Sequence, residues 1–481
     1  MTVTGALTYR SVAGRWALSA TILGSAMAGI DATVVSIALP TIGRDFHAGV
    51  TELQWVSNAY LLALSGFLLL GGALGDRYGR RRWFQIGTAW FALASLLCGL
   101  APDGLLLVAA RGLQGVGSAM LTPGSLAILQ ASFAPNDRPR AIGAWSGLSG
   151  VATAVGPLLG GWLISAVSWR LIFLVNLPVA LGVLLISARH VPESRDEQST
   201  RGVDVPGAAL FCLGLAGVAY GLTESPISGW TSAAVLGTLL GGVGMLLSFC
   251  LVERWSREPL LPLSIFRSLQ FSGTNAVTLL VYGALGGSFF LLPTDLQTVL
   301  RFSPLAAGLS FLPVTLIMLI FSPRSGALAA RIGPRLQMSV GPVVAGIGLG
   351  LLTRISTGGD YPRSVLPAAI VLAGGLAITV APLTATVLAA APSEHAGIAS
   401  AVNNDVARAA ALLAVAVLPA LSGITGRSYL HPAALTHGFH QAMFIAGAAC
   451  VGGGLLAVVT IRNPPKTARE VQPEQAADVL A

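Results

Sequence analysis

The stretch GGALGDRYGRRR, residues 71–82, places four arginines and one aspartate directly behind a long apolar run. Arginines at such a position are typical of a loop that stays on the cytoplasmic side of a membrane. That rule explains the arginines but gives no reason for Asp76. A related stretch, GALAARIGPR at 326–335, repeats most of the glycine, alanine, leucine and arginine positions but has Ala330 in place of the acid. The chain therefore looks internally duplicated, with a carboxylate in the first copy only.

The composition of the 481-residue chain is that of a protein buried in a lipid bilayer. Hydrophobic residues make up 54% of it, charged residues only 10%, and the mean hydropathy is +0.76. So little polar surface cannot coat a soluble globule. The net charge of +8 comes from short clusters without adjacent aromatic side chains, which argues against nucleic-acid binding. The four cysteines show none of the close pairs of a disulfide or zinc framework, so we expect no metal site.

Fourteen apolar stretches are long enough to cross about 30 Å of hydrocarbon. They show no alternation of apolar and polar residues, and helices satisfy their backbone polar groups internally in lipid. We therefore expect an all-α integral membrane protein with fourteen transmembrane helices. The stretches cover residues 16–39, 53–74, 83–101, 104–128, 141–165, 169–188, 205–223, 232–252, 272–294, 304–323, 336–353, 364–390, 398–422 and 440–461.

The distribution of arginine predicts which side of the membrane holds the termini. An even number of spans puts both termini on one side, and 20 of the 28 lysine and arginine residues fall on that side, against six in the opposite loops. Basic loops are retained in the cytoplasm. We therefore expect a multi-pass protein of the cytoplasmic (inner) membrane with both termini in the cytoplasm.

The internal repeat also predicts the domain organisation. Six spans precede the pair at about 205–252 and six follow it. The simplest layout is an amino-terminal six-helix bundle (1–190), two inserted transmembrane helices with linkers (191–260), a carboxy-terminal six-helix bundle (261–462) and a cytoplasmic tail (463–481). Parallel halves of this kind occur in transporters that rock about a central site.

The loop at 71–82 resembles the cytoplasmic signature of the major facilitator superfamily, and the chain is similar over almost its whole length to the fourteen-helix drug:proton antiporter branch, which performs multidrug efflux. The resemblance implies that Asp76, Arg77 and Arg80 latch the cytoplasmic side during alternating access. Gly72 would permit close approach of helices, and Gly79 a tight turn. The alternative is a loop that sets the topology and has no gating role.

The segment GIDATVVSIALPTIGRDF (29–46) resembles the first-helix signature of that branch, and LLLVAARGLQGVGSAM (105–120) resembles its fourth-helix motif. Asp31 and Arg111 lie at comparable depths in their spans, where an unpaired charge is expensive. The resemblance associates Arg111 and Gln114 with proton coupling. We expect Asp31 to titrate during transport while Arg111 tunes its affinity for a proton. A static ion pair that fixes helix packing is the alternative.

Two further segments resemble family signatures. GLSGVATAVGPLLGGWL (147–163) matches the fifth-helix pattern associated with exporters, although Ala152 stands where that pattern prefers glycine; a generic small-residue packing face is the alternative. SWRLIFLVNLPVAL (168–181) resembles the entry into the sixth span and suggests no chemistry of its own. The matching positions of the fifth helix are Gly156, Pro157, Gly160 and Gly161.

The segment GIASAVNNDVARAAALLAVAVLP (397–419) resembles the thirteenth helix of the branch. Its polar side chains need partners or water inside a membrane, and we expect them to line the path from the cytoplasm, with a structural network as the alternative for the arginine. These residues are Asn403, Asn404, Asp405 and Arg408.

Three other groups of polar residues are assigned no role in transport. Glu224 and Asp295 fall near the outer ends of their spans, where we expect them at the membrane interface. The histidines of the last outer loop are too loosely spaced to favour a metal site. They are His431, His437 and His440.

Absent motifs narrow the function. The chain has no P-loop and only one lysine, Lys466, so ATP coupling is not expected. It carries no nucleophile elbow or paired-histidine zinc pattern, so we expect a transporter rather than an enzyme. A carboxylate such as Asp31 makes the proton the natural coupling ion, with no other cofactor.

The sequence thus predicts a proton-coupled antiporter that expels amphipathic drugs or metabolites, cationic ones among them. We expect a monomer whose partners are a small-molecule substrate, protons and the lipid bilayer, with no nucleic acid. Two alternatives remain: a proton-coupled importer on the same fold, and a membrane sensor or scaffold that transports nothing.

Overall fold

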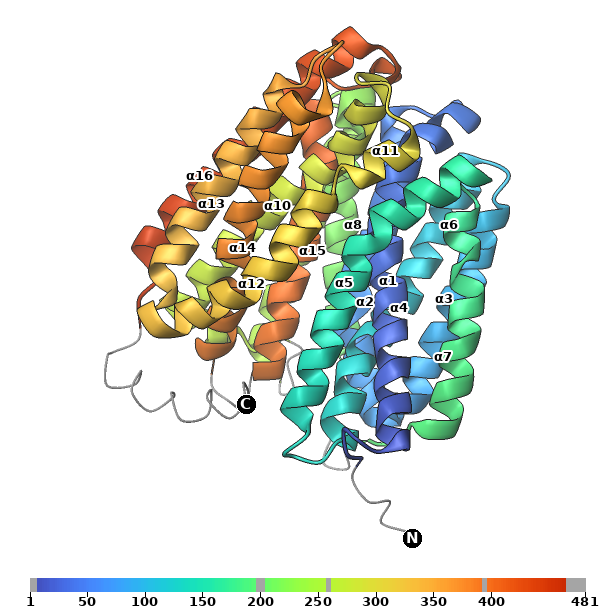
Figure 1. Cartoon of the computed structure of the whole chain (residues 1–481), viewed down its shortest axis with the longest axis vertical. Helices are drawn as coiled ribbons and strands as arrows, with labels where there is room; N and C mark the ends of the chain where they lie inside the picture. The colour runs from blue at the N-terminus through green and yellow to red at the C-terminus, as the bar shows by residue number, and fades with distance from the viewer. Residues whose placement is uncertain (1–6, 196–203, 257–260, 392–395, 464–481) are drawn as a thin grey trace. The chain divides into compact units, whose positions relative to one another are not determined.

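The computed structural model describes residues 7–195, 204–256, 261–391 and 396–463 (Figure 1). The predicted cytoplasmic residues Arg201, Arg257, Lys466 and Arg469, and nearly all of the predicted tail, lie outside the described residues. The α-helices are α1 (Val12–Asp45), α2 (Val50–Tyr78), α3 (Arg80–Leu100), α4 (Gly104–Ser132), α5 (Arg138–Ala166), α6 (Leu171–Leu174), α7 (Asn176–His190), α8 (Val205–Ser228), α9 (Ala233–Trp255), α10 (Leu269–Thr298), α11 (Pro304–Leu309), α12 (Leu312–Ile332), α13 (Pro334–Leu351), α14 (Leu366–Ala389), α15 (Ala396–Leu421) and α16 (Pro432–Thr460).

Within the described residues, fourteen helices are long and apolar enough to cross a membrane. Each of the fourteen stretches expected from the sequence corresponds to one of them, so the predicted all-α fold class and the number of spans are confirmed. Half of the fourteen helices extend beyond the expected apolar stretch by a turn or more at one or both ends. The extensions are polar enough to be missed by a hydropathy criterion, because hydropathy marks the lipid-facing length and not the helix ends.

Two of the fourteen spans are interrupted near one end, and a proline explains each break. α6 and α7 form one span that is interrupted at Val175, and α11 and α12 form another. Pro178 has no N–H to donate to the carbonyl of Leu174, and Pro313 likewise cannot donate to Leu309, so each helix loses a backbone bond at the break.

The described residues cluster into two units by their contacts. Unit 1 comprises Met1–Pro262, Phe289–Leu312 and Leu412–Phe439, and unit 2 comprises Leu263–Ser288, Pro313–Ala411 and His440–Ala481. Unit 1 holds α1–α9, unit 2 holds α13 and α14, and α10, α15 and α16 contribute to both. This division follows contacts and cuts through helices, whereas the boundaries expected at residues 190, 260 and 462 follow the sequence repeat and stay predictions.

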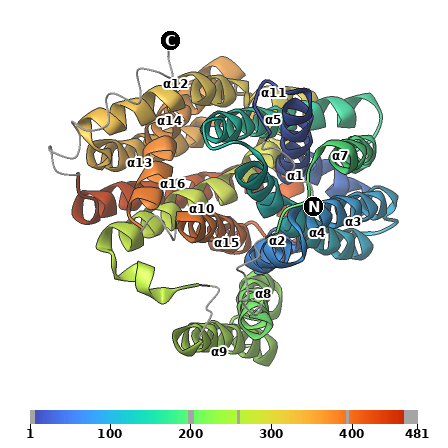
Figure 2. The ribbon, with the colours of Figure 1, turned by 90° about the horizontal axis from the view of Figure 1, so that it is seen from below.

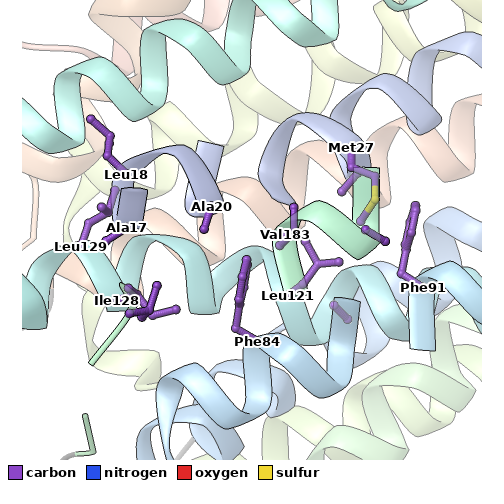
Figure 3. Close-up of a cluster of buried hydrophobic side chains, with 14 of the residues drawn as sticks. Ala17, Leu18, Ala20, Met27, Phe84, Phe91, Leu121, Ile128, Leu129 and Val183 are labelled. Atoms are coloured by element: carbon purple, nitrogen blue, oxygen red, sulfur yellow. The ribbon is translucent and has the colours of Figure 1, made fainter. Parts of the chain in front are cut away.

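The core of unit 1 is an apolar cluster between α1, α3, α4 and α7 (Figure 3). Phe84 and Phe91 of α3 are fully buried there against Leu121 of α4 and Met27 of α1. Small residues bring the backbones together: a Cβ atom added to Gly71 of α2 would lie 2.3 Å from the carbonyl oxygen of Ala119 on α4. Such contacts give membrane helices dense packing without a hydrophobic driving force between them.

The inserted pair α8 and α9 belongs to unit 1 and is attached through α8 (Figure 2). A Cβ atom at Gly66 of α2 would lie 2.6 Å from the Cys212 sulfur of α8, and Trp55 Nε1 donates to Glu224 Oε1 at 3.2 Å. α9 packs on α8 through Gly242, whose added Cβ would lie 2.7 Å from the Val218 nitrogen.

Unit 2 is held by the pair α13 and α14. A Cβ atom at Gly348 would lie 2.4 Å from the Leu372 nitrogen, and one at Gly375 would lie 2.3 Å from the Ala345 nitrogen. The two helices therefore touch backbone to backbone along most of their length, as small-residue stripes permit.

Candidate functional site

Asp31 is fully buried on α1 and forms an ion pair with Arg111 of α4. The guanidinium is also buried, and its Nε donates to the carbonyl oxygen of Val56 on α2 at 3.1 Å. The same Nη1 that pairs with Asp31 donates to Gln114 Oε1 at 2.5 Å. The match in depth between Asp31 and Arg111 therefore reflects a direct contact, and both charges are compensated inside the bundle.

Two amide side chains complete the shell of Asp31. Gln114 Nε2 donates to Asp31 Oδ1 at 2.8 Å and to Ser95 Oγ at 2.8 Å. Asn176 Nδ2, from the first residue of α7, donates to the same two oxygens at 3.2 Å and 3.3 Å. Both carboxylate oxygens thus accept hydrogen bonds, and the negative charge of Asp31 strengthens all of them.

An aromatic face covers Arg111. Its guanidinium carbon lies 4.3 Å from the ring centroid of Tyr60 and 5.7 Å from that of Phe173. The Tyr60 hydroxyl contacts Ser118 Oγ at 2.8 Å and donates to the Ala28 carbonyl at 3.2 Å. A cation that lies over an aromatic face and is shielded from water gains more interaction energy than an exposed one. The two rings therefore help to hold the Arg111 guanidinium in place beside Asp31.

The loop between α2 and α3 adopts the tight turn expected of Gly79, whose φ is +112°. Asp76 Oδ1 pairs with Arg80 Nε at 2.7 Å, one helical turn away. Arg77 instead lies over the Tyr78 ring, at 5.4 Å from its centroid. The acid that the positive-inside rule does not explain therefore fixes the arginine that follows the turn.

Glu193, which the sequence analysis did not single out, holds the start of α3. Its two carboxylate oxygens accept the backbone N–H groups of Arg81 and Arg82 at 3.0 Å and 3.1 Å. The Arg80 nitrogen donates to the Ser194 carbonyl at 2.8 Å. A carboxylate at a helix N-terminus is stabilised by the unpaired N–H groups and the helix dipole. An acid just after the sixth span, in VPES at 191–194, was the available signal.

The fifth-helix residues lie on two packing faces of α5 within unit 1. Cβ atoms added to Gly156 and Gly160 would lie 2.2 Å from Thr33 Oγ1 and 2.2 Å from Val34 Cγ2 of α1. Gly161 faces the segment that leads into α11, since its added Cβ would lie 2.4 Å from the Pro304 carbonyl oxygen.

The proline of this motif takes part in the second face. A Cβ atom at Gly308 of α11 would lie 2.2 Å from the Pro157 carbonyl oxygen. In addition, the Leu305 nitrogen donates to Ser165 Oγ at 3.2 Å. The small residues of this motif therefore pack α5 against both α1 and α11.

Polar side chains also form hydrogen bonds between helices at the end of unit 1 where α1 ends and α2 begins. Gln54 Nε2 donates to the carbonyl oxygens of Val415 and Ala416 at 2.6 Å and 3.1 Å, and Gln297 Nε2 donates to the Ile37 carbonyl at 3.0 Å. These two glutamines were not identified from the sequence, since a single amide in an apolar run has no periodic signal.

Two loop contacts reinforce this end. Arg427 donates to the His47 carbonyl at 2.6 Å, and the Tyr429 hydroxyl donates to the Ala48 carbonyl at 2.9 Å. We call the contacts of Gln54, Gln297, Arg427 and Tyr429 the closing contacts. Burial raises the pKa of the Tyr429 phenol, so this hydroxyl stays a donor at neutral pH.

The polar residues of α15 do not form a single hydrogen-bonded cluster. Asn403 Nδ2 donates to Asn275 Oδ1 at 3.0 Å and to Thr278 Oγ1 at 2.7 Å, inside unit 2. Asp405 is buried, and within the described part of the chain neither of its oxygens has a hydrogen-bond partner; Arg408 forms no ion pair with it despite the i, i+3 spacing. Asn404 is exposed and donates only to the Ser400 carbonyl, at 2.9 Å.

Asp295 lies in the last turn of α10, and its depth at the membrane interface stays a prediction. Its side chain is fully buried inside the protein. Glu224 is half-buried and accepts the Trp55 indole. Among the described residues no group of three His, Cys, Asp or Glu side chains is close enough to hold a metal ion.

Comparison with known proteins assigns the family. The model of the Major Facilitator Superfamily matches residues 21–415. The chain is 38% identical to the puromycin resistance protein of Streptomyces alboniger over 456 residues. This alignment covers 92% of this chain and 90% of that protein. It is 36% identical over 417 residues to the tetracenomycin C resistance and export protein of Streptomyces glaucescens, covering 84% and 75%. The multidrug resistance protein Stp of Mycobacterium tuberculosis is 38% identical over 392 residues, covering 80% and 72%.

Solved structures agree on the fold. A peptide transporter in complex with sulfate superposes with a TM-score of 0.68 at 17% identity, covering 94% of this chain and 96% of that one. The inward open xylose transporter of E. coli gives a TM-score of 0.62 at 15% identity, covering 94% and 97%. The chain therefore belongs to the major facilitator superfamily and is a multi-pass membrane transporter rather than an enzyme.

Proposed function

We propose that this transporter is a secondary active exporter that expels amphipathic drugs or metabolites, cationic ones among them, in exchange for protons. The relatives support the direction and the class of substrate, since they are named for export of tetracenomycin C and for resistance to puromycin or to several drugs. The packing of Gly156 and Gly160 on α1, in the motif typical of exporters, supports the same direction.

The observation that carries the proposal is the enclosed ion pair of Asp31 and Arg111. Asp31 belongs to α1, while its donors belong to α4 and α7. A proton on Asp31 removes the charge that strengthens its bonds to these donors, so protonation and the relative placement of these helices depend on each other. That dependence is what couples an ion gradient to alternating access.

The orientation proposed from the arginines places both termini in the cytoplasm of the cell and the protein in its cytoplasmic membrane. The closing contacts then face the exterior, and the turn with Asp76, Arg77 and Arg80 faces the interior. We propose that Gly72 and Gly79 let this turn fold tightly while the pair of Asp76 and Arg80 forms part of a cytoplasmic latch.

Asp405 provides a second carboxylate for the transport path. It is buried without a partner on α15, beside Asn403, Asn404 and Arg408 in sequence. An unpaired membrane carboxylate attracts either a proton or a cationic substrate. We propose that these residues line the route from the cytoplasm and that cations reach Asp405 before they are expelled.

Drug susceptibility in an efflux-deficient host tests this function. Expression of the protein should raise the inhibitory concentration of several amphipathic compounds, and a protonophore should abolish the accompanying efflux from loaded cells. Export that persists after the proton gradient is collapsed would contradict proton coupling. Uptake in place of efflux would establish the importer, and the absence of substrate movement across a broad panel would favour a sensor or scaffold.

A further inference from the structure

The proposed transport mechanism assigns no role to the carboxylate of Asp295. It lies in the last two turns of α10, in the part that belongs to unit 1. Its side chain is fully buried, and neither of its oxygens has a hydrogen-bond partner among the residues that the structure describes. Asp31 in the same unit shows the contrast, because that buried carboxylate accepts bonds from three side chains.

Asp295 is close in the chain to one of the closing contacts. Gln297, two residues further along α10, donates to the Ile37 carbonyl of α1. The neighbouring Leu296 and Val299 are buried, at 0% and 3% exposure. Buried residues therefore surround this turn of α10 on more than one face, and we infer that water reaches Asp295 only when this end of unit 1 opens.

The charged side chains on the helices and loops of the closing contacts either bond to groups other than Asp295 or are exposed to solvent. On α1, Asp31 is bonded to Arg111, Arg44 Nε donates to its own Pro40 carbonyl, and Asp45 accepts from Trp169 and Arg170.

On the remaining elements, Glu52 of α2 caps the Gly49 nitrogen, Arg301 after α10 is exposed, and Arg427 donates to His47. The segment of α15 within unit 1, Leu412–Leu421, has no ionisable side chain. None of these groups forms an ion pair with Asp295.

A carboxylate that is buried without a donor or a cation is strongly disfavoured in its ionised form, while the neutral acid loses much less on leaving water. The closed arrangement therefore selects the protonated acid, and an open, hydrated arrangement permits ionisation.

We propose that Asp295 is a proton-binding site of the closing contacts, which holds a proton while this end is closed and releases it when the end opens. On release the O–H bond breaks, the proton passes to water, and the carboxylate keeps the electron pair. Closing takes up one proton, so acid on this side favours the closed form. The inference rests on the alternating access of the proposed function and adds a second titrating group that controls the gate.

Thiol accessibility tests this site without substrate and without a gradient. In a cysteine-free version of the chain, Ala416→Cys places a thiol at a position that is fully buried when the end is closed. Its rate of reaction with a bulky maleimide in lipid nanodiscs is measured between pH 5 and 8. Each rate is divided by that of Ser356→Cys at an exposed position, which removes the intrinsic pH dependence of the reagent.

With Asp295 present, the normalised rate should rise with pH, by at most tenfold per unit, as expected for the loss of one proton. Asp295→Asn should keep the rate low and independent of pH, and Asp295→Glu should restore the rise. An unchanged slope in Asp295→Asn, or a flat profile with Asp295 present, overturns the proposal.

A second reporter and a second acid keep the result interpretable. Ala38→Cys on α1, also fully buried, repeats the measurement if Ala416→Cys does not fold. Asp31→Asn should retain the slope; a slope that disappears in Asp31→Asn and persists in Asp295→Asn assigns the titration to Asp31 and refutes the inference. If the slope depends on Asp295 but drug efflux proves independent of protons, the proposed function fails and the gate site stands.

Discussion

Asn176 on α7 and Gln114 on α4 donate to the same oxygen of Asp31, at 3.2 Å and 2.8 Å, and both also bond Ser95 of α3. Asp31 of α1 is therefore bonded directly to α4 and α7, and through their amides to α3. A change in the protonation of Asp31 alters the contacts of α1 with α4 and α7 together, which a simple surface ion pair could not do.

Removing the amide of Asn176 should weaken coupling. We expect Asn176→Ala to lose one hydrogen bond to a charged group, about 1.5–3 kcal/mol, and to reduce substrate-driven proton flux in proteoliposomes by roughly tenfold or more. Gln85→Ala is the matched control, because Gln85 also joins α3 to α7, through Ser187 at 3.1 Å, but does not bond Asp31. If both changes lowered the proton flux equally, Asn176 would contribute to helix packing only and not to coupling.

Glu193→Gln should loosen the start of α3. The amide replaces a charge that interacts with the helix terminus by about 0.3–1 kcal/mol, so hydrogen exchange at the Arg81 and Arg82 amides should accelerate by about two- to fivefold. Glu52→Gln, which alters the acid capping the Gly49 nitrogen of α2, serves as control and should leave these two amides unchanged. Unaltered exchange in Glu193→Gln would show that the carboxylate does not hold this turn.

A methyl group at Gly161 should disrupt the contact of α5 with the start of α11. The added Cβ would lie 2.4 Å from the Pro304 carbonyl oxygen, a backbone atom that cannot move aside on its own. We expect Gly161→Ala to cost about 1–3 kcal/mol and to lower drug resistance in the efflux-deficient host. Gly150→Ala, on the same helix but with nothing within 4 Å of its added Cβ, should keep both stability and resistance.

Asp405→Asn should separate stability from transport. Removing a buried carboxylate without a hydrogen-bond partner should stabilise the protein by roughly 1 kcal/mol, or about 1 °C in Tm for a chain of this length, and more at pH 8 than at pH 5 because the cost of burying the acid grows as the pH rises. Export of cationic compounds should fall while export of neutral ones is retained. A lower Tm at pH 8 would indicate that Asp405 has a stabilising partner.

The sequence alone was sufficient to predict the fold and to identify the charged residues of the candidate site. Hydropathy located all fourteen spans, and the depth of Asp31 and Arg111 within theirs corresponds to their ion pair. Charges in lipid are conspicuous because they are rare and costly. The glycines of α5 were equally visible, since small residues recur on one face.

The uncharged members of the site were not visible in the same way. Ser95, Asn176 and Gln54 are single polar residues in apolar helices, and their partners lie between 19 and 362 residues away in the chain. The buried state of Asp295 was also missed, because position along a span gives its depth in the membrane but not which neighbour covers it. These features depend on tertiary packing, which hydropathy does not encode.

The central claim is that Asp31 exchanges a proton in every transport cycle, and substrate-driven proton flux in proteoliposomes tests it most directly. With Asp31→Asn, addition of a transported drug should produce no proton flux although exchange of labelled for unlabelled drug continues. Asp360→Asn, at an exposed pair with Arg363, should behave like the unmodified protein. Undiminished proton flux in Asp31→Asn would contradict the account.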